Sequence, residues 1–144
     1  MTDPVLRQAR FAELTTTELY GLCRLRVDVF VVEQQCPYPE LDGRDLEPGT
    51  THLWFEAGGE PVATIRVLRE ETGWAIGRVA TAEGWRGSGL AARLMAAGLE
   101  LCGDEPVVLG AQTYLEGWYE RFGFRRTGPD YVEDGIPHLP MRRG

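Results

Sequence analysis

The residues with the clearest chemical meaning form a short loop, Arg86-Gly87-Ser88-Gly89-Leu90-Ala91. A run typical of a strand, Trp74 to Thr81, precedes the loop, and a run with the apolar spacing of a helix follows it. Two glycines allow a sharp turn that points several backbone N–H groups in one direction. Together with the unpaired N–H groups and positive dipole of a helix start, these donors form a site for phosphate. The loop therefore predicts a pyrophosphate site, with the charge of Arg86 at its rim.

The same loop admits two other interpretations. Residues Gly87 to Ala92 fit the dinucleotide fingerprint G-x-G-x-x-G/A, but that fingerprint requires an acid about 20 residues later. The corresponding region, Val107 to Leu109, contains no acid, and no Gly-Lys-Ser/Thr sequence marks a nucleoside-triphosphate loop. A nicotinamide-binding domain and a plain turn before a helix are therefore the weaker alternatives.

The composition is that of an ordinary globular chain. Its 144 residues are 43% hydrophobic and 26% charged, which suits one domain over residues 1–144. The net charge of −7 argues against a general nucleic-acid binder, which needs a basic surface. No apolar run approaches the ~20 residues of a membrane span, and residues 1–10 do not resemble a signal peptide. We therefore expect a cytoplasmic protein without nucleic-acid or membrane partners.

Metal binding is not expected from the cysteines and histidines. Cys23, Cys36 and Cys102 form no CxxC pair and no zinc pattern with His52 or His138. Reduced thiols are the default for such cysteines in a cytoplasmic protein. None of the three has an evident base beside it in the sequence, so all are poor candidates for a covalent nucleophile.

The N-terminal third predicts a strand, a helix and a long loop. The strand covers Pro4 to Phe11, and a helix begins after Thr15, because Thr15 and Glu18 have the spacing of a capping box. The β-branched run Val29 to Val32 favours extended structure at the end of that helix. Residues Cys36 to Gly49, with three prolines and several acids, form a loop long enough to suggest a function.

The rest of the chain alternates between strands and helices. A helix over about Ser88 to Cys102 precedes a continuous apolar run, Pro106 to Ala111, which is typical of a strand buried on both faces. Prolines place the final strand, Ile136 to Arg142, at a sheet edge or make it irregular. The other expected elements are strands at His52–Ala57, Glu60–Glu70, Trp74–Thr81 and Phe124–Thr127 and a short helix at Thr113–Phe122. Together they predict an α/β (α+β) fold with one mixed sheet and helices on its faces.

Two motifs resemble the signature of the GNAT N-acetyltransferases. Arg86 to Ala91 resembles their acyl-CoA loop, R/Q-x-x-G-x-G/A, and Trp118 to Phe124 resembles their Y-x-x-x-G-F element. The resemblance extends to the ElaA-like subfamily and covers nearly the whole chain from Leu19 to Arg142. The blocks that carry it are Phe30–Tyr38, Leu41–Asp45, Leu109–Gln112 and Glu133–His138.

This resemblance implies a mainly antiparallel sheet in which two neighbouring strands splay apart, with acetyl-CoA as co-substrate and no metal. The strand before the loop would bond the pantetheine arm through its backbone, as in strand addition. The loop would bind the pyrophosphate, and Arg78 could contact the CoA phosphates. The implied cofactor-binding residues are Val79, Ala80, Thr81, Arg86, Gly87, Ser88, Gly89, Leu90 and Ala91.

The resemblance also implies where protons move. Tyr119 is the expected general acid, which would protonate the departing CoA thiolate. Glu33 and His138 are the candidate bases for the incoming ammonium, with His52 as a third, and Glu33 is favoured because it lies beside the long loop. The acetyl group would pass directly to a primary amine in a ternary complex. The acids of the long loop could attract a cationic amine.

The sequence leaves the partners and one alternative function open. The acceptor is expected to be a small-molecule or peptide amine, and exposed edge strands near the C-terminus could pair in a homodimer. The alternative function is a non-catalytic CoA-binding module with a sensing or regulatory role. Replacing Tyr119 with Phe would slow an enzyme but would leave such a module unchanged.

Overall fold

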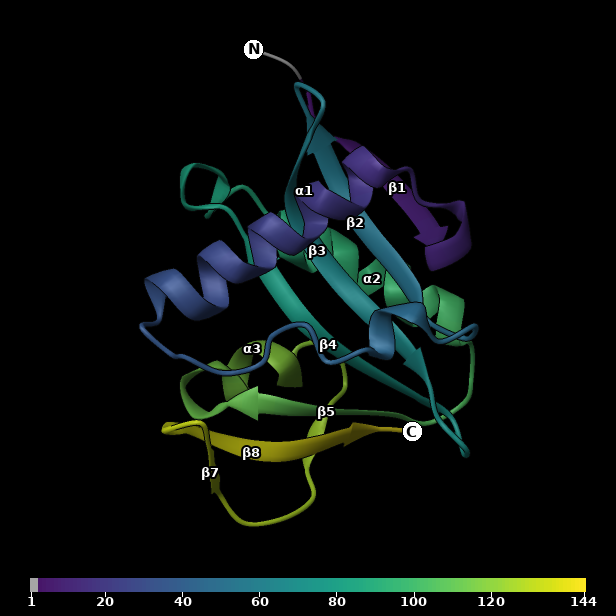
Figure 1. Cartoon of the computed structure of the whole chain (residues 1–144). Helices are drawn as coiled ribbons and strands as arrows, with labels where there is room; N and C mark the ends of the chain where they lie inside the picture. The colour runs from purple at the N-terminus through teal and green to yellow at the C-terminus, as the bar shows by residue number, and fades with distance from the viewer. Residues whose placement is uncertain (1–2) are drawn as a thin grey trace.

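The computed structural model describes residues 3–144, which form one eight-stranded sheet with helices on both faces (Figure 1). The strand order is β1-β2-β3-β4-β5-β8-β6, and β7 pairs with β8. The strands are β1 (Val5–Arg10), β2 (Thr51–Ala57), β3 (Glu60–Arg69), β4 (Trp74–Thr81), β5 (Val107–Gln112), β6 (Arg125–Arg126), β7 (Tyr131–Glu133) and β8 (Ile136–Arg143). The helices are α1 (Thr16–Val27), α2 (Leu90–Cys102) and α3 (Glu116–Glu120), with shorter helical turns η1 (Phe11–Glu13), η2 (Asp28–Glu33), η3 (Arg44–Leu46), η4 (Glu83–Trp85) and η5 (Thr113–Leu115). Within residues 3–144 no helix is long and apolar enough to cross a membrane.

Strands β4 and β5 are parallel neighbours that separate soon after they meet. They pair only at Trp74↔Val107 and Ala75↔Val108, whereas the other paired strands are antiparallel. Beyond these pairs the two strands diverge, and the segment that follows η2 crosses the gap between them (Figure 1). The prediction of a mainly antiparallel sheet with one splayed pair of strands is therefore confirmed.

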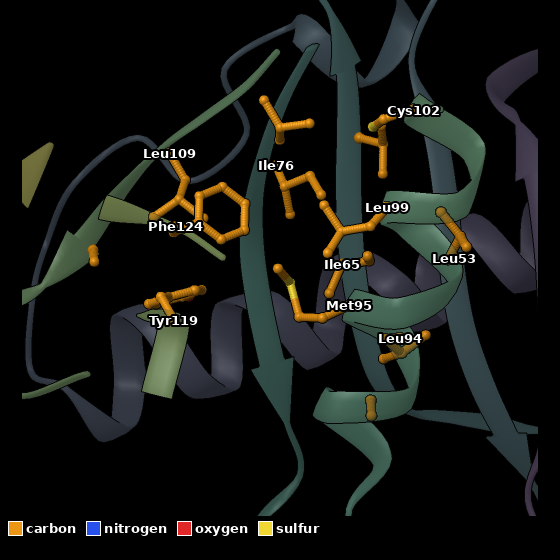
Figure 2. Close-up of a cluster of buried hydrophobic side chains, with 14 of the residues drawn as sticks. Leu53, Ile65, Ile76, Leu94, Met95, Leu99, Cys102, Leu109, Tyr119 and Phe124 are labelled. Carbon is orange, nitrogen blue, oxygen red and sulfur yellow. The ribbon is translucent and has the colours of Figure 1, made fainter. Parts of the chain in front are cut away.

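Two helices cover opposite faces of the sheet and build its core. α1 crosses one face of β2, β3 and β4, and α2 lies on the other face (Figure 1). Figure 2 shows Leu94, Met95 and Leu99 of α2 beside Ile65 of the sheet. Burial of each such side chain stabilises the fold by about 1.5–3 kcal/mol. Gly98 lets the helix approach closely, because a Cβ there would stand 2.8 Å from the Cδ1 atom of Ile65.

The first helical segment extends further than the sequence predicts. Thr15 and Glu18 form the expected capping box, with reciprocal hydrogen bonds of 3.0 and 2.9 Å. The chain then continues through the π-helical turn η2, so the prediction of extended structure at Val29 to Val32 was wrong. Val29 is buried beside Leu25 and strand β4, and this packing outweighs the weak strand preference of β-branched residues.

Two expectations for the C-terminal strands were also wrong. β5 is buried on one face only, because Val107 and Leu109 point into the core while Val108 is 42% exposed. β8 lies inside the sheet, between β5 and β6, rather than at an edge. Its prolines are tolerated because Pro140 falls between the stretches paired with β6 and β7, and Pro137 lies beyond the stretch paired with β5.

Candidate active site

The splay between β4 and β5 opens into a cavity of about 620 Å³. Four parts of the chain form its walls: strand β4, strand β5 with the η5–α3 segment, the end of η2 with the long loop, and the β7–β8 hairpin. Its polar lining residues include Tyr38, Arg78, Gln112, Tyr119, Glu133 and His138. The cavity therefore brings together polar groups that are distant from one another in the sequence.

The glycine loop leads into α2 as the sequence predicts. Gly87 and Gly89 have φ angles of +81° and +80°, a region that residues with a Cβ rarely occupy. Apart from the glycine itself and its two chain neighbours, no described atom lies within 4 Å of the position that a Cβ would take at either glycine, so the surface of the loop is open. Gly89 precedes α2 without a side-chain cap, which leaves the first backbone N–H groups of this 13-residue helix available to an anion.

Arg86 connects the glycine loop to the end of η2. Its Nε donates a 3.0 Å hydrogen bond to the carbonyl oxygen of Thr81, and its Nη2 donates to the carboxylate of Glu33. Glu33 is not among the residues that line the cavity. The structure thus brings two predicted site residues together, as an ion pair at the loop rather than at the cavity.

Strand β4 carries a bulge beside the cavity. Its register with β3 shifts at Arg78 and Val79, so that these two residues stand opposite a single residue of β3. Arg78 has a φ of +52°, which is uncommon for a residue with a side chain. Beyond Ala75, β4 has no strand partner on its β5 side in the described part of the chain. The backbone of residues 79–81 can therefore bond an extended molecule on that side.

Tyr119 lies on α3, between the hydrophobic core and the cavity. The residue is only 6% exposed, and its ring packs edge-on against Trp118 and Phe124. Figure 2 shows Tyr119 in the same buried cluster as Phe124. It lines the cavity, and among residues 3–144 its hydroxyl has no hydrogen-bond partner. Burial, with a smaller contribution from Tyr114, raises the pKa of the phenol to about 12. The hydroxyl is therefore protonated at neutral pH and able to donate a hydrogen bond or a proton.

The two histidines occupy different environments. His138 lines the cavity, where its Nδ1 lies 2.8 Å from the carbonyl oxygen of Ile136 and its ring stacks on Tyr131. Because a carbonyl only accepts, Nδ1 carries the hydrogen, and Nε2 of the neutral ring remains an acceptor, 3.9 Å from Oε2 of Glu133. His52 is buried outside the cavity lining, and burial lowers its pKa. Of these two predicted candidates, only His138 is at the cavity.

A buried network of ion pairs joins α1 to the long loop. Arg26 is 2% exposed, and it donates from Nε to Glu40 at 2.8 Å and from Nη1 to Asp45 at 2.6 Å. Arg66 of β3 also donates to Asp45, at 3.2 Å, and to Asp42, at 2.8 Å. Removing one partner would leave a buried charge unpaired, which is strongly destabilising. The network therefore fixes the long loop against the sheet.

Arg78 extends this network to the wall of the cavity. Its Nε lies 2.8 Å from Oε2 of Glu40 and forms an ion pair with it, but the angle is unsuitable for a hydrogen bond. Its guanidinium lies over the ring of Tyr38. Burial raises the pKa of Asp42, but hydrogen bonds and charge from neighbouring arginines outweigh burial and hold that pKa well below its ordinary value. Glu40, Asp42 and Asp45 are thus neutralised within the protein. The expectation that the loop acids attract a cationic amine was wrong for these three.

The Arg26 network was not predicted from the sequence, although the sequence carries one signal of it. Leu22, Leu25, Arg26 and Val29 follow the i, i+3, i+4, i+7 spacing of a helix face that packs on a core. An arginine at such a position requires carboxylate partners, since an unpaired buried charge is costly. The long loop supplies those partners, but the pairing depends on a tertiary arrangement that local sequence does not specify.

Comparison with known proteins identifies the family of this fold. A family model described as an acetyltransferase (GNAT) domain matches residues 21–143. This chain belongs to the GNAT acetyltransferase family. The matched range includes the glycine loop, Tyr119 and the β7–β8 hairpin. GNAT enzymes take an acyl-CoA as acyl donor, and the open loop at the start of α2 fits a substrate that carries a pyrophosphate.

Relatives and solved structures agree with this assignment. A UPF0039 protein of Mycobacterium tuberculosis is 47% identical over 148 residues, which cover 99% of this chain and 94% of the relative. Protein ElaA of Escherichia coli is 42% identical over 92% of this chain and 91% of its own length. Its crystal structure matches with a TM-score of 0.93 and 39% identity, covering 99% of this chain and 100% of that one. The structure of an acyl-CoA N-acyltransferase from Pseudomonas aeruginosa matches with a TM-score of 0.94 and 42% identity, over 99% and 100% of the two chains. This chain is accordingly an ElaA-like, acyl-CoA-dependent N-acyltransferase.

Proposed function

We propose that this enzyme transfers an acetyl group from acetyl-CoA directly to a primary amine, within one acyltransferase domain over residues 1–144. The observation that carries the proposal is the buried phenol of Tyr119, which lines the cavity and whose hydroxyl has no hydrogen-bond partner in the described chain. A protonated donor at this point suits the release of CoA, because the departing sulfur needs a proton.

The glycine loop and strand β4 supply the groups that would bind acetyl-CoA. Backbone N–H groups from Gly87 to Ala91, at the start of α2, would hold the pyrophosphate. The unpaired side of β4 at Val79, Ala80 and Thr81 would bond the amides of the pantetheine arm. Arg86 would contact a phosphate by exchanging the carboxylate of Glu33 for phosphate oxygens, since both side chains are partly exposed.

The transfer needs a neutral amine and a protonated leaving group. The ammonium first gives one proton to a base, and the nitrogen lone pair then attacks the thioester carbonyl to form the C–N bond. As the C–S bond breaks, Tyr119 gives its proton to sulfur, and the proton that the nitrogen releases restores the phenol through solvent. The products are an N-acetyl amine and CoA thiol. Cys36 lines the cavity, but its thiol contacts the carbonyl oxygen of Asp134 rather than a base, which favours direct transfer over an acyl-enzyme.

His138 is the better-supported base for the incoming ammonium. Its Nε2 is an acceptor in the cavity that Tyr119 also lines, and the hydrogen bond of Nδ1 to Ile136 fixes the ring. Glu33 is the alternative, and it would act only after release from Arg86. We propose His138 as the proton acceptor, with Glu33 as the carboxylate that Arg86 exchanges for phosphate when the cofactor binds.

The experiment that tests this function is CoA thiol release from acetyl-CoA in the presence of a panel of primary amines. We expect amine-dependent thiol release with an equal amount of acetylated amine and no acetylated protein. The chain contains no lysine, so lysine acetylation within the enzyme cannot produce a background signal. Acetylated cysteine formed at the rate of turnover would overturn direct transfer. CoA binding without turnover of any amine would favour a CoA-binding sensing module instead.

A further inference from the structure

The charges around the cavity are unevenly balanced. Its two lining arginines are both occupied: Arg78 pairs with Glu40 and Asp42, and Arg44 pairs with Glu47 and Glu70. Two lining carboxylates, Glu133 and Asp134, have no arginine partner among residues 3–144. The cavity therefore offers two unneutralised negative charges and no unpaired guanidinium in the part of the chain that the structure describes.

The fold holds these two acids in a defined place. Glu133 pairs with Ile136 across a two-residue turn whose central residues, Asp134 and Gly135, have φ angles of +50° and +79°. Positive φ at both positions is the requirement of a tight type I′ hairpin. The thiol of Cys36 contacts the carbonyl oxygen of Asp134 at 3.3 Å, which ties the turn to the segment after η2, another part of the cavity wall.

Two further groups in the same cavity support a ligand site beside these two acids. Tyr119, which is 6% exposed, lines the cavity, and its hydroxyl has no hydrogen-bond partner in the described chain. The Nε2 of His138 lies 3.9 Å from Oε2 of Glu133. A nitrogen hydrogen-bonded to His138 and a second nitrogen bonded to Glu133 would be at most about 10 Å apart, with each hydrogen bond about 3 Å long. A short aliphatic diamine meets that limit.

We propose that the acceptor is a short diamine, whose reacting amine lies at Tyr119 and His138 and whose second ammonium is held by Glu133 and Asp134. This inference rests on the proposed acetyl transfer to a primary amine and specifies its substrate class. An acceptor with a carboxylate would meet the two unneutralised acids and would find both lining arginines occupied. A monoamine would leave the two acids without a counter-charge.

Calorimetric binding in the presence of CoA tests the inference separately from catalysis. The probes are 1,4-diaminobutane, butylamine and 4-aminobutanoate, which share one primary amine and differ at the far end. The wild-type protein should bind the diamine at least about tenfold more tightly than butylamine, and 4-aminobutanoate most weakly. In Glu133→Gln/Asp134→Asn this advantage should disappear, and in Glu133→Gln alone it should fall. Glu60→Gln, an exposed acid in the β2–β3 hairpin, should retain it.

The possible outcomes test the diamine inference separately from the proposed acetyl transfer. Equal affinity for diamine and monoamine, no binding of any probe, or an advantage that survives in the double variant would overturn the diamine inference, even if the enzyme acetylates amines. Selective diamine binding that depends on the two acids, with no thiol release from acetyl-CoA, would support the ligand class and overturn the proposed transfer. Thermal unfolding of each variant verifies that it is folded.

Discussion

The glycine loop at the start of α2 and the cavity beside β5 differ in how the chain holds them. The loop is one continuous stretch, and its binding groups are backbone N–H groups exposed by two glycines and an uncapped helix. The cavity is assembled from four separate segments, and its chemistry depends on side chains such as Tyr119 and His138. Packing of α2 on the sheet supports the loop, whereas buried ion pairs of Arg26 and Arg66 support one wall of the cavity.

This difference assigns different tasks to the two regions. A backbone site would suit the pyrophosphate that every acyl-CoA carries, and outside its glycines it would tolerate changes of side chain. A cavity built from side chains of distant segments can change its acceptor through substitutions in a loop or a hairpin, without disturbing the cofactor. We therefore expect substitutions in the glycine loop to change CoA binding, and substitutions in the cavity and its supporting wall to change kcat or stability.

The largest effect is expected from Arg26→Ala on the acceptor side. The change leaves Glu40 and Asp45 buried without their main partner, which should lower the free energy of unfolding by about 3–5 kcal/mol. Denaturant unfolding measures this change. Arg24→Ala, two residues away on the same helix, is the matched control, because among residues 3–144 Arg24 pairs only with exposed Asp28; it should cost less than about 0.5 kcal/mol. Equal losses in both variants would contradict the structural role of the network.

The next effect concerns the cofactor loop alone. Gly89→Val introduces a branched side chain at a φ of +80°, over the surface that would receive the pyrophosphate. CoA should then no longer raise the melting temperature at a concentration that saturates the wild type. Gly58→Val imposes comparable backbone strain in the hairpin between β2 and β3, at a φ of +59°. That control should lose stability but keep the CoA-induced shift, and if Gly89→Val keeps it as well, the loop assignment is wrong.

A smaller effect distinguishes the two candidate bases. His138→Gln should lower kcat by at least about 100-fold, because general base catalysis typically contributes 10²–10⁴-fold. Glu33→Gln should leave kcat within about twofold and should tighten CoA binding slightly, since Arg86 loses a competing carboxylate. Steady-state kinetics with saturating amine and calorimetry with CoA measure the two quantities. The reverse pattern in kcat would identify Glu33 as the base.

The smallest effect is a pH dependence of stability. Burial lowers the pKa of His52 from 6.5, so below about pH 6.5 the unfolded chain binds a proton that the folded chain does not. The free energy of unfolding should therefore fall as pH falls from about 6.5 to 5, by at most about 1.4 kcal/mol per pH unit from this residue. His52→Gln should reduce that slope whatever its effect at neutral pH. An unchanged slope would show that His52 does not remain neutral in the folded protein.

Local features of the fold could be predicted from the sequence, and features that depend on tertiary contacts could not. The Thr15 capping box and the positive φ angles of Gly87 and Gly89 follow from residues within a few positions of each other. The π-helical turn at Val29 was missed because its packing against β4 outweighs local propensity. Pairing of Arg26 with the long loop was missed for the same kind of reason, since its partners are 14 and 19 residues away.

The same contrast between local features and tertiary contacts holds for the candidate site. The cofactor loop was visible as a motif, whereas the position of Glu33 beside Arg86 and the acidic rim at Glu133 required the folded chain. Tyr119 was proposed from its place in a family motif. Its burial and its open hydroxyl depend on how α3 packs beside Phe124, which the motif does not describe.

The kinetics of Tyr119→Phe test the central claim most directly. With acetyl-CoA and an accepted amine, kcat should fall by about 10²–10⁴-fold while the affinity for CoA stays the same, because only the proton donor is lost. Since the pKa of the phenol is about 12, the wild type should show no loss of rate from deprotonation of Tyr119 up to about pH 10. Tyr114→Phe, at a tyrosine that is 76% exposed, should retain full activity. A Tyr119→Phe enzyme with the kcat of the wild type would contradict the account.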